Sequence, residues 1–124
     1  MLSSAKIQAF LPTTDFDRAR TFFEGLGLRY VKSDGHALVM DANGTMIRIS
    51  KVPPDFKPQP FTILGWQVPD IASAVADLAS RGVRFERFGF LEQDEAGIWT
   101  APSGDRVAWF KDPDGNTLSV SQHV

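Results

Sequence analysis

The chain has 124 residues and a formal net charge of −2, so we expect a single domain of ordinary size. Basic residues are scattered rather than gathered into a stripe, which argues against nucleic-acid binding. No apolar run is long enough to cross a bilayer, and no secretory leader is recognisable, so a cytoplasmic protein is the expectation. The absence of cysteine excludes disulfides, thiolate metal ligands and a cysteine nucleophile.

The sequence repeats itself in two copies. Asp15 corresponds to Asp70 at a spacing of 55 residues (70 − 15), and Gly44 corresponds to Gly115 at a spacing of 71 (115 − 44). The second copy is therefore about 16 residues longer, and we place the extra residues between 88 and 105. The order of structural signals also repeats, which is the stronger indication of two related units.

In the first copy, a strand is expected at residues 6–12, and a helix follows that Asp15 caps and Gly27 ends. The helix carries an apolar stripe at helical spacing, formed by Ala19, Phe22, Phe23 and Leu26. Three strands are then expected at 29–32, 36–41 and 45–51. Asn43-Gly44 predicts a tight hairpin turn between the last two, because both residues tolerate positive φ.

The second copy has the same order of signals. We expect a strand at 61–68, a helix between Asp70 and Gly82, and strands near 83–88, 97–100, 105–111 and 116–122. The segment 112–116 (Asp-Pro-Asp-Gly-Asn) predicts a tight turn before the last strand. Four of the eight prolines lie at 53–60, which is typical of a stiff linker. The predicted organisation is therefore a first module at 1–52, a linker at 53–60 and a second module at 61–124.

Each copy is a βαβββ unit, and one helix can cover only one face of its sheet. The other face of each sheet is left free to curve, and two such sheets side by side make a cup. The predicted fold class is α+β, with two βαβββ modules forming a curved mixed-sheet cup.

Two stretches resemble a known superfamily. The helix pattern of 15–27, with Phe22-Phe23 ahead of Leu26-Gly27, and the ending at 109–118 (WFKDPDGNTL) resemble the glyoxalase / bleomycin-resistance / extradiol-dioxygenase superfamily, also called vicinal oxygen chelate proteins. The resemblance implies paired βαβββ modules around a ligand cup, usually in a homodimer. It also implies a divalent metal held by residues on the first and last strand of each module.

Carried over residue by residue, the resemblance places the metal-ligand positions at Gln8, Arg48, Ile63 and Ser119. A divalent ion needs carboxylate or imidazole donors here. Isoleucine offers no lone pair, arginine is a fixed cation, and the amide and hydroxyl are weak ligands. We therefore expect neither a metal nor another cofactor, and the metal-dependent step of related enzymes should be lost with it.

The two histidines give little support to other chemistry. His36 opens a strand and is interpreted as a surface residue, and His123, the next-to-last residue, is expected to fray. Neither belongs to a recognisable Ser/His/Asp set, so no hydrolase triad is expected. An acidic cluster at Glu92, Asp94 and Glu95 predicts a solvated loop, with a lid over the cup as the alternative.

Strand parity indicates which residues line the cup. Phe10 shares a face with Gln8, and Ser121 shares a face with Ser119. Trp99 and Trp109 flank the cup strands and serve either packing or ligand stacking, and whether Trp109 or Phe110 points inward stays open. The predicted ligand-binding set is Gln8, Phe10, Arg48, Ile63, Trp99, Ser119 and Ser121, with Arg48 as the anchor of an anionic group and Gln8 and Ser119 adding hydrogen bonds.

Three functions remain open. The first is a metal-free binding protein that sequesters or carries a small anionic or aromatic compound. The second is a lyase, isomerase or dioxygenase of the same superfamily with non-standard ligands, which would require Glu24, Glu86 or His36 in the site. The third is a degenerate subunit retained for dimer contacts. The partners expected are a small-molecule ligand and a second copy of the chain.

Overall fold

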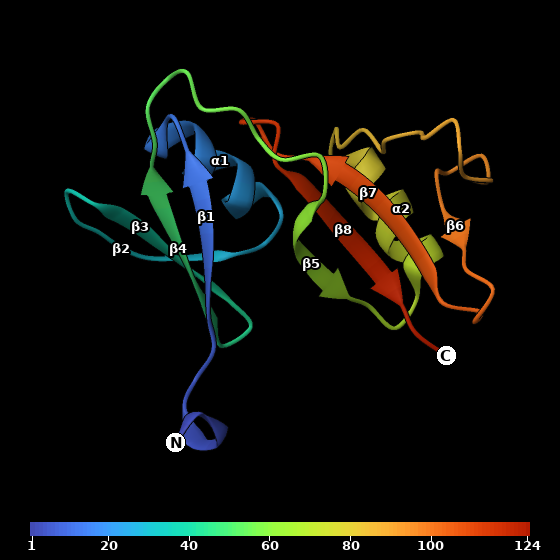
Figure 1. The fold of residues 1–124 in the computed structure, drawn as a ribbon, viewed down its shortest axis with the longest axis horizontal. Helices are drawn as coiled ribbons and strands as arrows, with labels where there is room; N and C mark the ends of the chain where they lie inside the picture. Colours follow the sequence, from blue (N-terminus) through green and yellow to red (C-terminus); the bar gives the residue numbers. More distant parts are fainter. The chain divides into compact units, whose positions relative to one another are not determined.

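The chain folds into two units that repeat the same element order (Figure 1). The computed structural model describes all residues from 1 to 124. The first unit spans Met1–Lys57 and the second Pro58–Val124, so the boundary falls within the proline-rich segment at 53–60. A short 3₁₀ helix, Leu2–Ser4, precedes the first unit's sheet. No helix has the length and apolar character needed to cross a membrane.

The first unit is a four-stranded sheet with one helix on one face. Asp15 caps the helix, because its side chain accepts a hydrogen bond from the Arg18 N–H at 3.1 Å. The strand order is β1-β4-β3-β2, with β1 parallel to β4 and the other neighbours antiparallel. The elements are β1 (Gln8–Thr13), α1 (Phe16–Gly25), β2 (Arg29–Ser33), β3 (Ala37–Ala42) and β4 (Thr45–Lys51).

The predicted hairpin turn and core of this unit are confirmed. Asn43 and Gly44 both have positive φ, 52° and 93°, between β3 and β4. Ile47 and Ile49 are 1% and 0% exposed and share the buried face with Phe23 of α1. Since side chains alternate along a strand, Arg48 lies on the opposite face.

The second unit has the same topology, with strand order β5-β8-β7-β6. Asp70 caps its helix by accepting a hydrogen bond from the Ser73 N–H at 3.2 Å. Ile71 and Val75 of the helix are buried together with Phe110 and Leu118 of the sheet. The elements are β5 (Thr62–Gln67), α2 (Ile71–Ser80), β6 (Trp99–Thr100), β7 (Arg106–Lys111) and β8 (Thr117–Gln122).

The strand predicted at 83–88 does not form, and this expectation is wrong. Phe85 makes one isolated bridge to Phe110 beside β7, and the chain then leaves the sheet edge. Pairing with β7 resumes at β6, where Trp99 lies opposite Val107 of β7. The additional residues of the second copy therefore interrupt its edge strand, because an edge strand can lose pairing without breaking the interior of the sheet.

Candidate functional site

The face of the first sheet that α1 leaves uncovered carries the residues expected to bind a ligand. The parallel register sets Gln8 beside Met46 and Phe10 beside Arg48. Gln8, Phe10 and Arg48 therefore lie on the face opposite Ile47 and Ile49. Phe10 is 64% exposed although it sits within a strand, so this face presents apolar surface together with an amide and a guanidinium.

The Arg48 guanidinium has no hydrogen bond or ion pair with another residue, although its side chain is partly buried. Its electrostatic effect falls on Asp34. The pKa of Asp34 is lowered mainly by hydrogen bonds from the N–H groups of His36 and Ala37, and the charge of Arg48 adds a smaller contribution. By contrast, Arg29 on the same sheet is paired with Asp41 at 2.8 Å. Because no hydrogen bond joins Arg48 to Asp34, the N–H donors of the guanidinium are left to water or to a bound anion.

The uncovered face of the second sheet is lined by rows that cross the strands. Ser119 lies between Gly65 and Trp109, and Ser121 lies between Gln67 and Val107. A side chain at Gly65 would collide with the Ser119 hydroxyl, since an added Cβ would lie 2.6 Å from its oxygen. The absence of a side chain at 65 thus leaves room for the Ser119 hydroxyl beside it.

Ile63 occupies an irregular position on β5. Thr62 is in register with Thr117 and Leu64 with Leu118, so Ile63 is the extra residue of a β-bulge. The register neighbour of Ser119 on β5 is Gly65. The structure therefore places Ile63 and Ser119 in one sheet but not side by side.

Four aromatic rings form a chain that runs from the uncovered face of the second sheet to the loop at 88–90. The Trp99 and Trp109 ring centroids are 6.1 Å apart, Trp109 meets Phe88 edge to face at 5.4 Å, and Phe88 meets Phe90 at 5.7 Å. Phe90 is 83% exposed, whereas Phe110 is 1% exposed and belongs to the core. Trp109, rather than Phe110, therefore faces the site. We call these four rings the aromatic platform.

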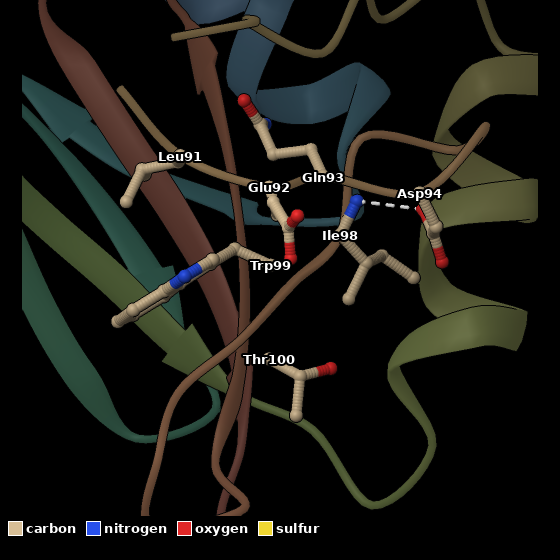
Figure 2. Close-up of a pocket in the computed structure, with 7 residues that line it drawn as sticks. All are labelled: Leu91, Glu92, Gln93, Asp94, Ile98, Trp99 and Thr100. Atoms are coloured by element: carbon tan, nitrogen blue, oxygen red, sulfur yellow. Dashed lines mark hydrogen bonds between the residues drawn. The ribbon is translucent and has the colours of Figure 1, made fainter. Parts of the chain in front are cut away.

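A cavity of about 630 Å³ adjoins the platform at Trp99 (Figure 2). In Figure 2, the Leu91 and Trp99 side chains extend away from Asp94, whose carboxylate accepts a hydrogen bond from the Ile98 N–H at 2.9 Å. The cavity is lined by Leu91, Glu92, Gln93, Asp94, Ile98, Trp99 and Thr100.

The loop around this cavity is held by its own side chains. The Gln93 amide nitrogen donates to the carbonyls of Glu86 and Gly97, and its oxygen accepts from the Phe88 N–H. Asp94 accepts from the N–H groups of both Ala96 and Ile98. The sequence predicts a solvated loop or a lid at Glu92, Asp94 and Glu95. In the structure, the Asp94 carboxylate stabilises the turn of this loop.

The side chains present do not fit a divalent metal. The positions that the superfamily uses hold an amide, a guanidinium, an aliphatic side chain and a hydroxyl, and none supplies a carboxylate or imidazole. Nowhere in the chain do three or more His, Asp or Glu side chains gather closely enough to bind one. Glu24 is paired with Arg20, and Glu86 lies 3.7 Å from Lys111, so both acids already have basic partners.

The structure also brings Ser121, His123 and Asp105 into contact, which the sequence did not predict. The Ser121 hydroxyl lies 3.0 Å from Nε2 of His123, and Nδ1 of His123 lies 3.2 Å from Asp105. The expectation that no Ser/His/Asp set exists is wrong, and so is the expectation that His123 is frayed. Hairpin register was the missed signal: Arg106 pairs with Gln122, so the next residue outward on each strand brings Asp105 opposite His123.

Comparison with known proteins agrees with this architecture. No curated protein matches the chain in sequence. Among solved structures, a bleomycin resistance determinant encoded on the transposon Tn5 has a TM-score of 0.75 at 22% identity, covering 97% of this chain and 98% of that one. A bleomycin-binding protein complexed with bleomycin has a TM-score of 0.73 at 22% identity, with 98% and 100% covered.

An enzyme of the same fold is also similar. Lactoylglutathione lyase from Agrobacterium tumefaciens has a TM-score of 0.68 at 19% identity, with 96% of this chain and 93% of that chain covered. At these identities the structures establish the fold. The sequence model of the Glyoxalase/Bleomycin resistance protein/Dioxygenase superfamily matches residues 6–120, and the chain therefore belongs to that superfamily.

Proposed function

We propose that this protein is a metal-free binding protein that sequesters or carries a small planar or anionic compound. The aromatic platform is the observation that carries the proposal. Phe110, on the helix side of the sheet, is 1% exposed, whereas Trp99 and Trp109 lie on the uncovered face and are partly exposed, and Phe90 is 83% exposed. Exposed rings at stacking distance offer a flat apolar molecule a surface that water solvates poorly.

The Arg48 guanidinium, which has no hydrogen-bonded partner, supports the proposal that the bound compound is anionic. A partly buried arginine without a protein partner is costly, and a carboxylate, phosphate or phenolate can satisfy it through two parallel hydrogen bonds. Gln8 shares the face with Arg48 and adds a neutral donor. The bleomycin-binding neighbour, solved with its ligand, supports small-molecule binding as a use of this fold.

The alternative is a lyase, isomerase or dioxygenase that employs other metal ligands. The similarity to lactoylglutathione lyase favours it. The donor chemistry at Gln8, Arg48, Ile63 and Ser119 weighs against it, because a cation at position 48 repels a dication.

We further propose that the protein acts as a homodimer. β1 and β5 are edge strands, and the start of the chain exposes Leu2, Ile7 and Phe10 at 86%, 78% and 64%. Open edges and exposed apolar side chains of this kind favour association with another copy.

If no metal binds, Zn²⁺, Ni²⁺ or Mn²⁺ at 100 µM should leave the melting temperature unchanged, because only a ligand that binds the native state raises it. Differential scanning fluorimetry measures this, and elemental analysis of protein purified without chelator provides the second readout. One equivalent of metal per chain, or stabilisation that EDTA reverses, would show that the alternative is correct.

Replacing Trp99 with alanine should weaken binding of 2-naphthamide, a neutral planar probe, by about 3- to 10-fold, since an aromatic pair contributes roughly 0.5–1.5 kcal/mol beyond area burial. Isothermal titration calorimetry measures the Kd. Trp66→Phe is the matched control, because Trp66 stacks on the buried Phe110 at 6.3 Å on the helix side. Equal losses in both variants would contradict a role for the platform.

Arg48→Met keeps much of the side-chain stem and removes the charge. We expect it to weaken 2-naphthoate binding by about tenfold, or 1.4 kcal/mol, while 2-naphthamide binding changes little because that probe carries no charge. Arg29→Met is the control, since Arg29 is already paired with Asp41. A change within about threefold for the carboxylate would mean that Arg48 is not the anion anchor.

The dimer predicts a mass near twice the chain's 13.7 kDa in size-exclusion chromatography with light scattering. Phe10→Asp should shift the population toward monomer, because it places a charge on the exposed apolar surface. A single-chain mass across a hundredfold range of concentration would rule the dimer out.

A further inference from the structure

Three side chains at the open end of the β7–β8 hairpin form a connected hydrogen-bonded set. The Ser121 hydroxyl lies 3.0 Å from Nε2 of His123, and Nδ1 of His123 lies 3.2 Å from the second carboxylate oxygen of Asp105. The serine and the carboxylate thus contact opposite nitrogens of one imidazole. This is the connectivity by which a serine nucleophile, a general base and an orienting acid are linked.

The fold holds each member in place. Ser121 is within β8, between β5 and β7, and His123 follows two residues later, so strand alternation directs both side chains to one face. Asp105 immediately precedes β7 and its first carboxylate oxygen accepts the Val124 N–H at 2.9 Å. That bond ties the backbone beyond His123 to the same acid and keeps the imidazole in position.

The hydrogen bonds determine which nitrogen carries the proton. A carboxylate only accepts, so Nδ1 of His123 donates to Asp105, and in the neutral ring Nε2 is left to accept the Ser121 proton. The pKa of Asp105 is lowered, chiefly by the Val124 N–H and then by His123, so the acid is charged at neutral pH. His123 and Asp105 keep 46% and 31% of their side chains exposed, so solvent and small molecules reach the set.

A second cavity lies beside the imidazole. It measures about 460 Å³ and is lined by Gln67, Val68, Pro69, Gln122 and His123. Gln67 is the register neighbour of Ser121 on β5, and its side-chain amide makes no hydrogen bond within the protein. An unpaired amide donor beside a serine hydroxyl is suited to stabilise negative charge that develops on a carbonyl oxygen.

We propose that Ser121, His123 and Asp105 form an acyl-transfer triad that hydrolyses small activated esters, with Gln67 as the oxyanion donor. The Ser121 oxygen bonds to the ester carbonyl carbon while its proton passes to Nε2 of His123. The tetrahedral intermediate then expels the alcohol oxygen, which takes that proton. Water repeats the two steps on the acyl-serine, so that the carboxylic acid leaves and the serine is restored.

This activity is separate from the binding proposed above, but the two surfaces adjoin. In register, Ser121 lies beside Val107, and Val107 lies beside Trp99 of the aromatic platform. The substrate class that suits this row is a small ester with an aromatic leaving group. The aromatic leaving group can lie against Trp99 while the acyl group of the ester enters the cavity near Gln67.

The experiment uses the full-length protein and two probes, p-nitrophenyl acetate and diisopropyl fluorophosphate. We expect a burst of p-nitrophenolate approaching one equivalent per chain. We also expect the diisopropylphosphoryl adduct on the Ser121 oxygen, formed with loss of fluoride and located by mass spectrometry of the digested protein. Ser121→Ala should abolish both signals, and Ser80→Ala, at the exposed end of α2, should abolish neither.

Asp105 acts through His123, so its test compares a neutral and a conservative replacement at position 105. Asp105 is the one charged group in contact with the ring, and the residues facing it from 67–69 and from Gln122 are uncharged. Asp105→Asn should slow labelling at pH 7 at least tenfold, because an amide can donate to Nδ1 and disfavour the tautomer whose Nε2 accepts the Ser121 proton, and Asp105→Glu should recover part of the rate. Circular dichroism verifies that each variant is folded.

If the contacts among Ser121, His123 and Asp105 only hold the end of β8 in place, the expected outcome is different. In that case the wild-type protein shows no burst and no adduct on Ser121, and either result overturns the proposal without reliance on any variant. An adduct on another residue, or labelling that persists in Ser121→Ala, overturns it as well. Loss of 2-naphthamide binding leaves this test unaffected, so the binding proposal and the triad fail independently.

Discussion

The register of the β7–β8 hairpin is the constraint on which the second unit depends, and a buried aspartate at its turn maintains it. Asp112 is 6% exposed, and its first carboxylate oxygen accepts the N–H groups of Asp114 and Asn116, each at 2.9 Å. Its second oxygen accepts the Asn116 side-chain amide at 2.9 Å. Burial raises the pKa of this carboxyl despite those donors, so the turn retains the acid at an electrostatic cost.

This register places the residues of β7 and β8 on the uncovered face. It sets Trp109 beside Ser119, directs Phe110 into the core, and brings Asp105 opposite His123 at the far end of the hairpin. A slip of β7 by one residue against β8 would turn its side chains over, burying Trp109 and exposing Phe110. The buried Phe110, Leu118 and Ala108 therefore stabilise the same register that the turn specifies.

The two units have kept one topology and acquired different chemistry. In the first, the uncovered face carries Arg48, which has no hydrogen-bonded partner, and the exposed Phe10; in the second, it carries hydroxyl groups and the aromatic platform. The interrupted edge strand adds aromatic side chains to this set, because the loop that replaces it carries Phe88 and Phe90.

The sequence by itself determined the local structure and, through it, the fold. Aspartate caps at Asp15 and Asp70, the Asn43-Gly44 turn and the alternation around Arg48 act between residues close in the chain, so they could be recognised without coordinates. The orientation of Trp109, the split edge strand and the contact of Ser121 with His123 and Asp105 were decided by the tertiary structure. These depend on which residues of neighbouring strands lie opposite one another. Pairing between strands is set by the whole buried face and by the inserted loop, and neither is encoded within a few adjacent residues.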